Sequence, residues 1–345
     1  MMGKEPSSAP TLGRRHIGPF SVSAIGLGCM GLSYAYGSPP PPDVAARVLL
    51  TALDHGIDLF DTAALYGFGA NEDLLGRVLQ PHRQRIVLAS KCGIFKDEKG
   101  ARLVDGRPET IRRTCEESLR RLRTDVIDIY YLHRLDRSVP IEESVGAMAE
   151  LVRAGKVRTI GLSEVSASTM RRANAVHPIV AMQSEYSLWT RNPEIAVLAT
   201  CRELGTAFVA FSPLARAFLS GTMRDPATEL EPGDIRRGMP RFYEANYARN
   251  VALLTEYEAI AREVGCTMAQ LALAWLLAKD PIVVPIPGTR HPHYVVENAA
   301  AAKITIEPAL VARLDALINE RTVVGGRYNE AAQADSDTEE FDLGR

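Results

Sequence analysis

The feature that most constrains the fold is the alternation of short β-branched runs with longer helical patterns along most of the chain. This alternation is typical of repeated βα units. Eight runs are predicted as strands, over residues 22–27, 57–61, 86–90, 126–132, 158–162, 179–183, 207–211 and 282–286. Because these runs are apolar on both faces and number eight, they favour a closed α/β fold, the (β/α)8 or TIM barrel, over a doubly wound sheet.

The remaining segments are interpreted around this repeat. A chain of 345 residues suggests about two domains of roughly 150 residues, but a single barrel commonly fills 250 or more. We therefore predict one barrel domain over residues 12–320, with an N-terminal hairpin near 14–21, a long loop over 212–247 and an extra helix over 308–318. Residues 321–345 are predicted as an acidic C-terminal tail that frays or binds a partner. Its acidic residues include Asp335, Asp337, Glu339, Glu340 and Asp342.

Composition excludes several classes of function. Hydrophobic residues make up 46% of the chain and charged residues 24%, which is enough for a core and excludes bulk disorder. A net charge of −2 gives no general attraction to nucleic acid or anionic lipid. The N-terminus is polar and no run of about 18 apolar residues occurs, so we expect a soluble cytoplasmic protein without a membrane span. The five scattered cysteines include no C-x-x-C pair, and neither a disulfide framework nor a metal site is predicted.

One glycine motif invites a misleading interpretation. Gly26, Gly28 and Gly31 spell G-x-G-x-x-G directly after the first predicted strand, as in a Rossmann dinucleotide site. That motif must open a helix whose N-terminus receives the pyrophosphate. Here it leads into a Ser/Tyr-rich stretch and four prolines, so a packed turn at the barrel mouth is favoured instead.

Ionisable residues follow several predicted strands at their carboxyl ends, where barrels carry their chemistry. Asp61, Lys91 and His133 end the second, third and fourth strands, and Tyr66 lies in the loop after Asp61. Each alone is an ordinary loop or packing residue. Together they favour proton donation by the tyrosine hydroxyl, with its pKa lowered by Lys91, which Asp61 keeps charged. His133 is expected to orient the substrate oxygen.

The chain resembles the aldo-keto reductase superfamily, whose (β/α)8 barrels reduce carbonyls with NADPH. Three stretches carry the resemblance: Leu59-Phe60-Asp61-Thr62-Ala63 with Tyr66-Gly67, Leu88-Ala89-Ser90-Lys91, and Ile127-Asp128-Ile129-Tyr130-Tyr131-Leu132-His133. The resemblance implies a catalytic tetrad of Asp61, Tyr66, Lys91 and His133. Within the superfamily, residues 183–189 and 25–31 look most like the branch of pyridoxal reductases, perakine reductases and potassium-channel β-subunit relatives.

The resemblance also implies a cofactor site for NADP(H). Ser163 and Gln183 are expected at the carboxamide, Tyr186 on the nicotinamide ring, and Arg290 with Thr289 at the 2′-phosphate. The full expected set is Gly28, Met30, Asp61, Ser163, Gln183, Tyr186, Phe211, Ser212, Pro213, Leu214, Arg216, Gly288, Thr289, Arg290, Glu297 and Asn298. Two departures bear on it: Glu164 stands where the family usually has Asn, and Ala215-Arg216-Ala217 replaces a turn that usually contains Gly.

The expected activity is hydride transfer from nicotinamide to an aldehyde or ketone carbonyl, with Tyr66 as the proton donor. Met30, Tyr34, Trp189 and Phe218 are expected to form the pocket wall for a small apolar or aromatic carbonyl substrate. Two alternatives stay open, namely a cofactor-binding redox sensor of the channel β-subunit type and a phosphate-binding lyase or isomerase barrel. The sequence leaves the physiological substrate and the oligomeric state open.

Overall fold

The computed structural model describes residues 12–96 and 102–342. Its strands are β1 (Arg14–Ile17), β2 (Phe20–Ser23), β3 (Leu27–Gly28), β4 (Leu59–Asp61), β5 (Val87–Cys92), β6 (Ile94–Lys96), β7 (Arg102–Val104), β8 (Ile127–Leu132), β9 (Val157–Ser163), β10 (Ile179–Glu185), β11 (Ala207–Phe211) and β12 (Val283–Pro285). Its α-helices are α1 (Pro42–Asp54), α2 (Ala70–Leu79), α3 (Pro108–Leu122), α4 (Ile141–Arg153), α5 (Ala167–Val176), α6 (Val197–Leu204), α7 (Pro226–Glu229), α8 (Glu244–Val251), α9 (Leu253–Val264), α10 (Met268–Lys279), α11 (Pro292–Ala300), α12 (Pro308–Leu317) and α13 (Glu330–Ala334).

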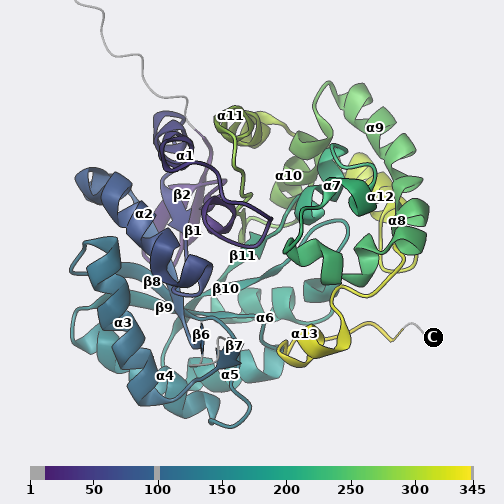
Figure 1. Ribbon diagram of the computed structural model, residues 1–345. Helices are drawn as coiled ribbons and strands as arrows, with labels where there is room; N and C mark the ends of the chain where they lie inside the picture. Colours follow the sequence, from purple (N-terminus) through teal and green to yellow (C-terminus); the bar gives the residue numbers. More distant parts are fainter. Residues whose placement is uncertain (1–11, 97–101, 343–345) are drawn as a thin grey trace, which may run out of the picture.

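Eight of these strands form one parallel sheet that curls into a barrel, with helices around its outside (Figure 1). The strand order is β12-β11-β10-β9-β8-β5-β4-β3, so each strand pairs with its neighbour along the repeat. Two backbone hydrogen bonds join the ends of this sheet, from Gly26 N to Pro285 O (3.0 Å) and from Gly28 N to Pro287 O (3.2 Å). The predicted (β/α)8 barrel is therefore confirmed.

Among the eight predicted barrel strands, only the first departs from the prediction. The segment 212–247, predicted as a long loop, contains the short helix α7 and the start of α8, and the hairpin of β6 and β7 was not predicted. The predicted run 22–27 is split, because Val22 and Ser23 belong to β2 of the N-terminal hairpin and only β3 enters the barrel. The hairpin itself is formed as predicted, with β1 antiparallel to β2. The glycine motif leads into a short 3₁₀ turn, Met30–Leu32, and not into an α-helix. This agrees with its interpretation as a packed turn.

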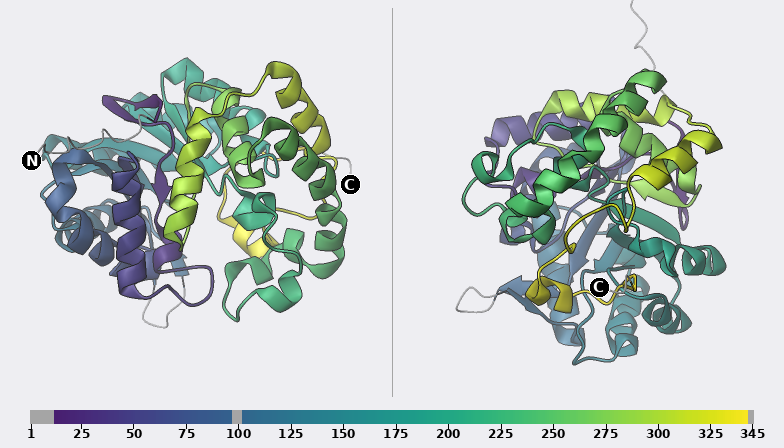
Figure 2. Two further views of the ribbon diagram at one scale, coloured as in Figure 1. Left: turned by 90° about the horizontal axis from the view of Figure 1, so that it is seen from above. Right: turned by 90° about the vertical axis from the view of Figure 1, so that its right-hand side faces the viewer.

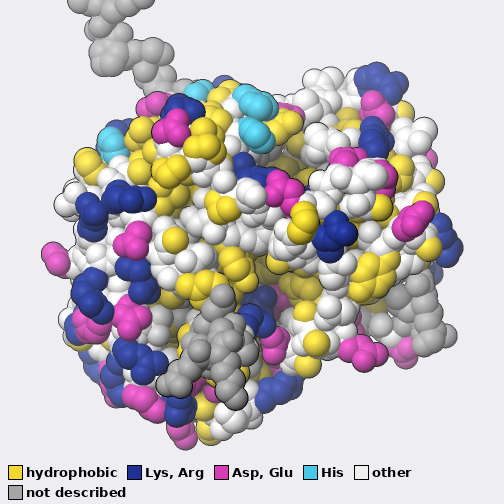
Figure 3. All heavy atoms as spheres, in the orientation of Figure 1, with side chains coloured by type: hydrophobic (Ala, Val, Ile, Leu, Met, Phe, Trp, Pro, Cys, Tyr) yellow, Lys and Arg dark blue, Asp and Glu magenta, His cyan; other side chains and the backbone are white. Residues whose placement is uncertain are grey.

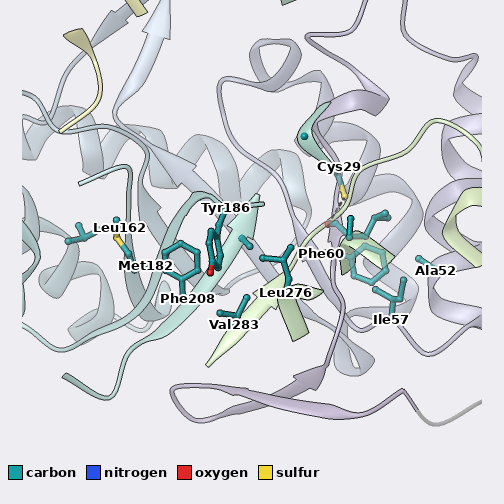
Figure 4. Close-up of a cluster of buried hydrophobic side chains, with 14 of the residues drawn as sticks. Cys29, Ala52, Ile57, Phe60, Leu162, Met182, Tyr186, Phe208, Leu276 and Val283 are labelled. Carbon is teal, nitrogen blue, oxygen red and sulfur yellow. Dashed lines mark hydrogen bonds between the residues drawn. The ribbon is translucent and has the colours of Figure 1, made fainter. Parts of the chain in front are cut away.

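Two layers of buried side chains stabilise the barrel. The inner layer consists of alternate residues along the strands, such as Leu59, Ile129 and Val209, and Ile17 and Val22 of the hairpin pack against it. The outer layer lies between the sheet and the helices, and Figure 4 shows part of it around Phe60, Phe208 and Leu276. Since successive strand residues point to opposite sides, the two-face-apolar runs of the sequence fill both layers.

The C-terminal residues do not behave as the predicted fraying tail. From α12 the chain crosses one face of the barrel and forms α13 beside β7 and α5 (Figures 1 and 2). Asp335 pairs with Arg102, and the Asp337 carboxylate accepts hydrogen bonds from the Ser166 amide (3.1 Å) and the Thr169 hydroxyl (2.7 Å). Asp337 thus binds the positive N-terminus of α5 and Asp335 binds a β7 arginine, so this segment is docked through its charge.

Within the described residues, no single helix is long and apolar enough to cross a membrane; the pair Glu244–Val264 and Met268–Lys279 passes on length and composition only when its 79° bend is ignored. All five cysteines are free, and only Cys266 is not fully buried.

Barrel closure predicts a large effect of adding one methyl group at Gly28. A Cβ atom there would lie 2.7 Å from the Ile286 carbonyl oxygen, and backbone cannot move away cheaply. Gly28→Ala should lower the free energy of unfolding by about 1–3 kcal/mol, the usual cost of overpacking. Urea denaturation followed by circular dichroism measures this.

Gly146, inside α4, is the matched control because a Cβ atom there meets nothing within 4 Å. Gly146→Ala should raise stability by about 0.5–1 kcal/mol, since alanine is the better helix former. Equal stability of the two variants would contradict the proposed close approach at the barrel seam.

Candidate active site

Four ionisable side chains meet at the carboxyl ends of three neighbouring strands. Asp61 is the last residue of β4, Lys91 lies near the end of β5 and His133 directly follows β8. Tyr66 begins a short 3₁₀ turn after β4. All four are buried. They lie close together because β4 pairs with β5 and β5 pairs with β8 in parallel register.

Lys91 holds this group together through three hydrogen bonds. Its ammonium pairs with the Asp61 carboxylate, donates to the Thr62 carbonyl (2.8 Å) and donates to the Tyr66 hydroxyl (3.2 Å). An ammonium has three N–H donors, so all of them are used here. Because the Tyr66 oxygen accepts from Lys91, the proton of Tyr66 is free to be donated to another acceptor.

The charges of this group differ in one respect from the expectation. Burial raises the pKa of Tyr66 above its ordinary value, and the opposing effect of the Lys91 charge does not overcome it. Burial would lower the pKa of Lys91, but the Asp61 carboxylate and Tyr66 raise it above its usual range. The expected lowering of the Tyr66 pKa is therefore wrong, whereas the charged state expected of Lys91 agrees with the structure.

His133 is held in its neutral form. Burial, then the charges of Arg134, Lys91 and Arg102, lower its pKa well below 6.5. Its ring meets the Tyr66 ring edge-on at 5.8 Å, and its Nδ1 atom is buried without a hydrogen-bond partner among the described residues. A neutral imidazole has one N–H donor, and His133 lines a cavity, so it is suited to hydrogen-bond a ligand oxygen there.

A cavity of about 520 Å³ opens beside these residues, and Figure 3 shows the molecule hollowed on this face. Asp61, Tyr66 and His133 line one end of it. Fifteen of the sixteen residues expected to bind the cofactor also line it, namely Gly28, Met30, Asp61, Ser163, Gln183, Phe211, Ser212, Pro213, Leu214, Arg216, Gly288, Thr289, Arg290, Glu297 and Asn298.

The turn after β11 suits the phosphates of a dinucleotide. Ala215, Arg216 and Ala217 all have positive φ, a backbone conformation that glycine favours, so the turn keeps a left-handed shape without glycine. Turns of this kind expose backbone amides that bind anions. Arg216, Arg236 and Arg290 add positive charge to the cavity wall, and these features together fit a phosphorylated cofactor.

Three predicted side chains do not reach the cavity. Tyr186 lies in the outer core of Figure 4, where its ring packs against Phe208 and Trp275 and its hydroxyl donates to Glu194 (2.6 Å). Trp189 and Phe218 stack on each other with ring centroids 4.1 Å apart. These arrangements do not agree with a stacking role for Tyr186 or a wall role for Trp189 and Phe218, because packing and a hydrogen bond already use their surfaces.

Met30 and Tyr34, the other two predicted wall residues, do line the cavity. They pack on an apolar cluster of Leu65, Tyr66 and Ile94. Sequence reasoning missed several wall residues, among them Tyr36, Leu65, Ile94, Arg102, Arg134, Arg236 and Tyr328. Of these, Arg134 had a signal, since it directly follows His133, whereas Tyr328 lies in the segment predicted as a tail.

The fold and this group of residues define a class of barrel oxidoreductase that acts on carbonyls. The model of the Aldo/keto reductase family matches residues 24–319. The chain belongs to the aldo/keto reductase family.

Its relatives include aldo-keto reductase yakc [NADP(+)] of Schizosaccharomyces pombe, which is 42% identical over 331 residues, covering 94% of this chain and 96% of the relative. Among solved structures, glycerol dehydrogenase AKR11B4 from Gluconobacter oxydans has a TM-score of 0.81 and 30% identity, covering 88% of this chain and 94% of its own. An aldo/keto reductase from Klebsiella pneumoniae, solved in complex with NADP and acetate, has a TM-score of 0.68 and 29% identity, covering 90% and 95%.

The burial of neutral His133 predicts part of the pH dependence of stability. In the unfolded chain His133 has a pKa of about 6.5, so below that pH the unfolded chain binds a proton that the folded protein does not bind. The free energy of unfolding therefore decreases as the pH falls below about 6.5. The loss is at most about 1.4 kcal/mol per pH unit for one group. His133→Gln should remove this contribution, as measured by urea unfolding between pH 8 and about pH 5.

His177, which is only partly buried after α5, provides the control. His177→Gln should keep the slope of the parent protein. The same slope in all three proteins would show that His133 is not held neutral by the fold.

Proposed function

We propose that the protein is an NADPH-dependent reductase of aldehydes or ketones, with Tyr66 as the proton donor. The observation that carries this proposal is Tyr66, whose hydroxyl accepts a hydrogen bond from Lys91 and which lines the cavity together with neutral His133. The names of the S. pombe relative and of the K. pneumoniae structure, which refer to NADP, support the choice of cofactor.

Residues at two parts of the cavity would hold the cofactor. Ser163 and Gln183 lie near the tetrad, where the nicotinamide carboxamide needs hydrogen-bonding groups, and Phe211 offers an aromatic surface. Arg216 and Arg290 would hold phosphate groups as charge-assisted donors. NADPH bound there supplies the hydride for the carbonyl carbon.

The chain's own residues manage the proton and the developing charge. His133 hydrogen-bonds the carbonyl oxygen and directs it toward Tyr66. The Tyr66 hydroxyl gives its proton to that oxygen as negative charge develops on it. Lys91 stabilises the resulting phenolate, and Asp61 keeps Lys91 in place through their buried ion pair.

The wall beside Tyr66 favours an apolar or aromatic carbonyl substrate. Met30, Tyr34, Leu65 and Ile94 form an apolar cluster with Tyr66 at this end of the cavity. The Tyr34 ring stacks near the Tyr66 ring at a centroid distance of 6.4 Å. A planar aromatic aldehyde is therefore a suitable first substrate to test.

The proposed function predicts steady oxidation of NADPH by the purified protein in the presence of an aromatic aldehyde, followed by the absorbance of the reduced nicotinamide. Tyr66→Phe removes the proton but little volume, and it should lower kcat by about 100-fold or more while leaving NADPH affinity nearly unchanged. Tyr257→Phe is the matched control, because it removes a buried hydroxyl bound to the Met268 carbonyl (2.9 Å) and Tyr257 does not line the cavity.

Three outcomes would count against the proposal. If the Tyr66→Phe variant retains most of the parent's activity, Tyr66 is not the proton donor. NADPH binding without turnover would favour the redox-sensor alternative, and absence of NADPH binding would favour the phosphate-binding barrel.

A second prediction concerns the choice between NADPH and NADH. Arg290 lines the cavity beside the N-terminus of α11, where the positive end of the helix adds to its charge. A charge-assisted contact with the 2′-phosphate contributes about 1.5–3 kcal/mol. Arg290→Ala should therefore raise the Kd for NADPH about tenfold and leave that for NADH almost unchanged, as measured by fluorescence titration.

Arg290 donates a hydrogen bond to the Ser38 carbonyl (2.8 Å). Arg237 supplies the control, since it likewise donates to a backbone carbonyl, that of Leu230, but does not line the cavity. Arg237→Ala should leave both Kd values unchanged. Equal weakening of both cofactors by Arg290→Ala, or no weakening, would place the 2′-phosphate elsewhere.

A further inference from the structure

A cluster of buried charges lies behind the carboxyl ends of β9 and β10. It joins two carboxylates, Glu164 and Glu185, to two guanidinium groups, Arg216 and Arg327. Arg327 contacts both carboxylates, at 2.7 Å from Glu164 and 3.0 Å from Glu185. Arg216 contacts Glu185 at 2.8 Å. All four residues are at least nine-tenths buried.

Two members of the cluster are next to residues expected at the nicotinamide. Glu164 directly follows Ser163, and Glu185 lies two residues after Gln183. The Glu164 carboxylate also accepts a hydrogen bond from the Glu185 amide (3.0 Å), and the Glu164 amide donates to the Gln183 carbonyl (3.0 Å). Glu164 therefore fixes the end of β9 to the end of β10 instead of reaching into the cavity, whose wall does not include it.

The charge of Glu164 depends on a distant part of the chain. Among the described residues, Arg327 is the cation that pairs with Glu164, whereas Glu185 has Arg216 as a second partner. A fully buried carboxylate without a partner costs several kcal/mol. Without Arg327, the buried charge of Glu164 would have no counter-ion, which would favour its departure from this place and loosen the link between β9 and β10.

The same arginine touches the cavity wall from behind. Its guanidinium lies over the Phe211 ring at 5.8 Å and donates to the Tyr328 hydroxyl at 3.1 Å. Phe211 and Tyr328 both line the cavity. Arg327 also pairs with Glu164, whose amide binds the Gln183 carbonyl. The Gln183 side chain donates to the Asp61 carboxylate (2.8 Å). A chain of contacts therefore runs from Arg327 to the tetrad.

We infer that Arg327, contributed by the C-terminal segment, is a positioning residue for the nicotinamide half of the cofactor site. Through Glu164 and Glu185 it holds Ser163 and Gln183 at the spacing that the carboxamide requires. This inference rests on the proposed function, because it takes the cavity as a site for NADPH. It assigns the departure at Glu164 a role, namely an ionic anchor for the C-terminal segment in place of a direct cofactor contact.

Two ligands distinguish positioning from a general loss of structure. NADPH fills both halves of the site, whereas adenosine 2′,5′-bisphosphate lacks the nicotinamide and uses only the adenosine half. Arg327→Met removes the charge and keeps an apolar stem. It should raise the Kd for NADPH about tenfold and change the Kd for the bisphosphate less than twofold, measured by tryptophan fluorescence below the unfolding temperature.

Arg83→Met is the matched control at the opposite end of the barrel. Arg83 pairs with buried Asp128 at 2.8 Å, next to the first residue of β8 and away from the cavity. Its loss should lower stability but leave both Kd values within about twofold of the parent.

A double variant tests the mechanism, and a lysine variant guards against failure to fold. Glu164→Gln combined with Arg327→Met removes both charges and should restore the Kd for NADPH to within about threefold of the parent. Arg327→Lys retains the charge, but lysine lacks the planar, five-donor fork with which the guanidinium binds both carboxylates, so NADPH affinity should fall to an intermediate value.

Other results would overturn the inference. If Arg327→Met and Arg327→Lys bind NADPH like the parent, or weaken NADPH and the bisphosphate equally, Arg327 serves stability alone. A parent protein that binds neither ligand would instead contradict the proposed function.

Discussion

The burial of the Lys91 ammonium is the constraint on which the site depends. A charge that is only 1% exposed must have every N–H donor satisfied. Asp61, the Thr62 carbonyl and Tyr66 meet this requirement, and they come from the end of β4 and the loop that follows it. Stability and chemistry therefore place the same demand on these residues, since the contacts that make the charge tolerable also direct the Tyr66 hydroxyl.

The barrel and the grouping of the tetrad could be predicted because both follow from local periodicity. Apolar runs of strand length indicated β4, β5 and β8. Parallel strands in a barrel have their carboxyl ends at the same end of the barrel. Asp61, Lys91 and His133 could thus be placed together from their positions in the runs alone. The first strand was displaced because Val22 and Ser23 have the same β pattern whether they pair in a hairpin or in the barrel.

The predictions that failed concern side chains whose position or charge depends on tertiary contacts, and these contacts cannot be read from the sequence. Tyr186 follows the end of β10, and the sequence could not show that its hydroxyl binds Glu194. The pKa of Tyr66 depends on a balance between burial and the Lys91 charge, and the residues present do not give their relative size. Arg327 and Tyr328 lie in a segment without periodicity, and their partners Glu164 and Arg216 are more than 100 residues away.

The docked C-terminal segment also has a consequence for the order in which the protein is made. Glu164 leaves the ribosome well before Arg327, so a nascent barrel contains this buried carboxylate without its counter-ion until residue 327 has been synthesised. The ends of β9 and β10 are therefore the last part of the barrel to become rigid. Removal of the final twenty residues by a protease would loosen that part again while leaving the strands and the tetrad in the remaining chain.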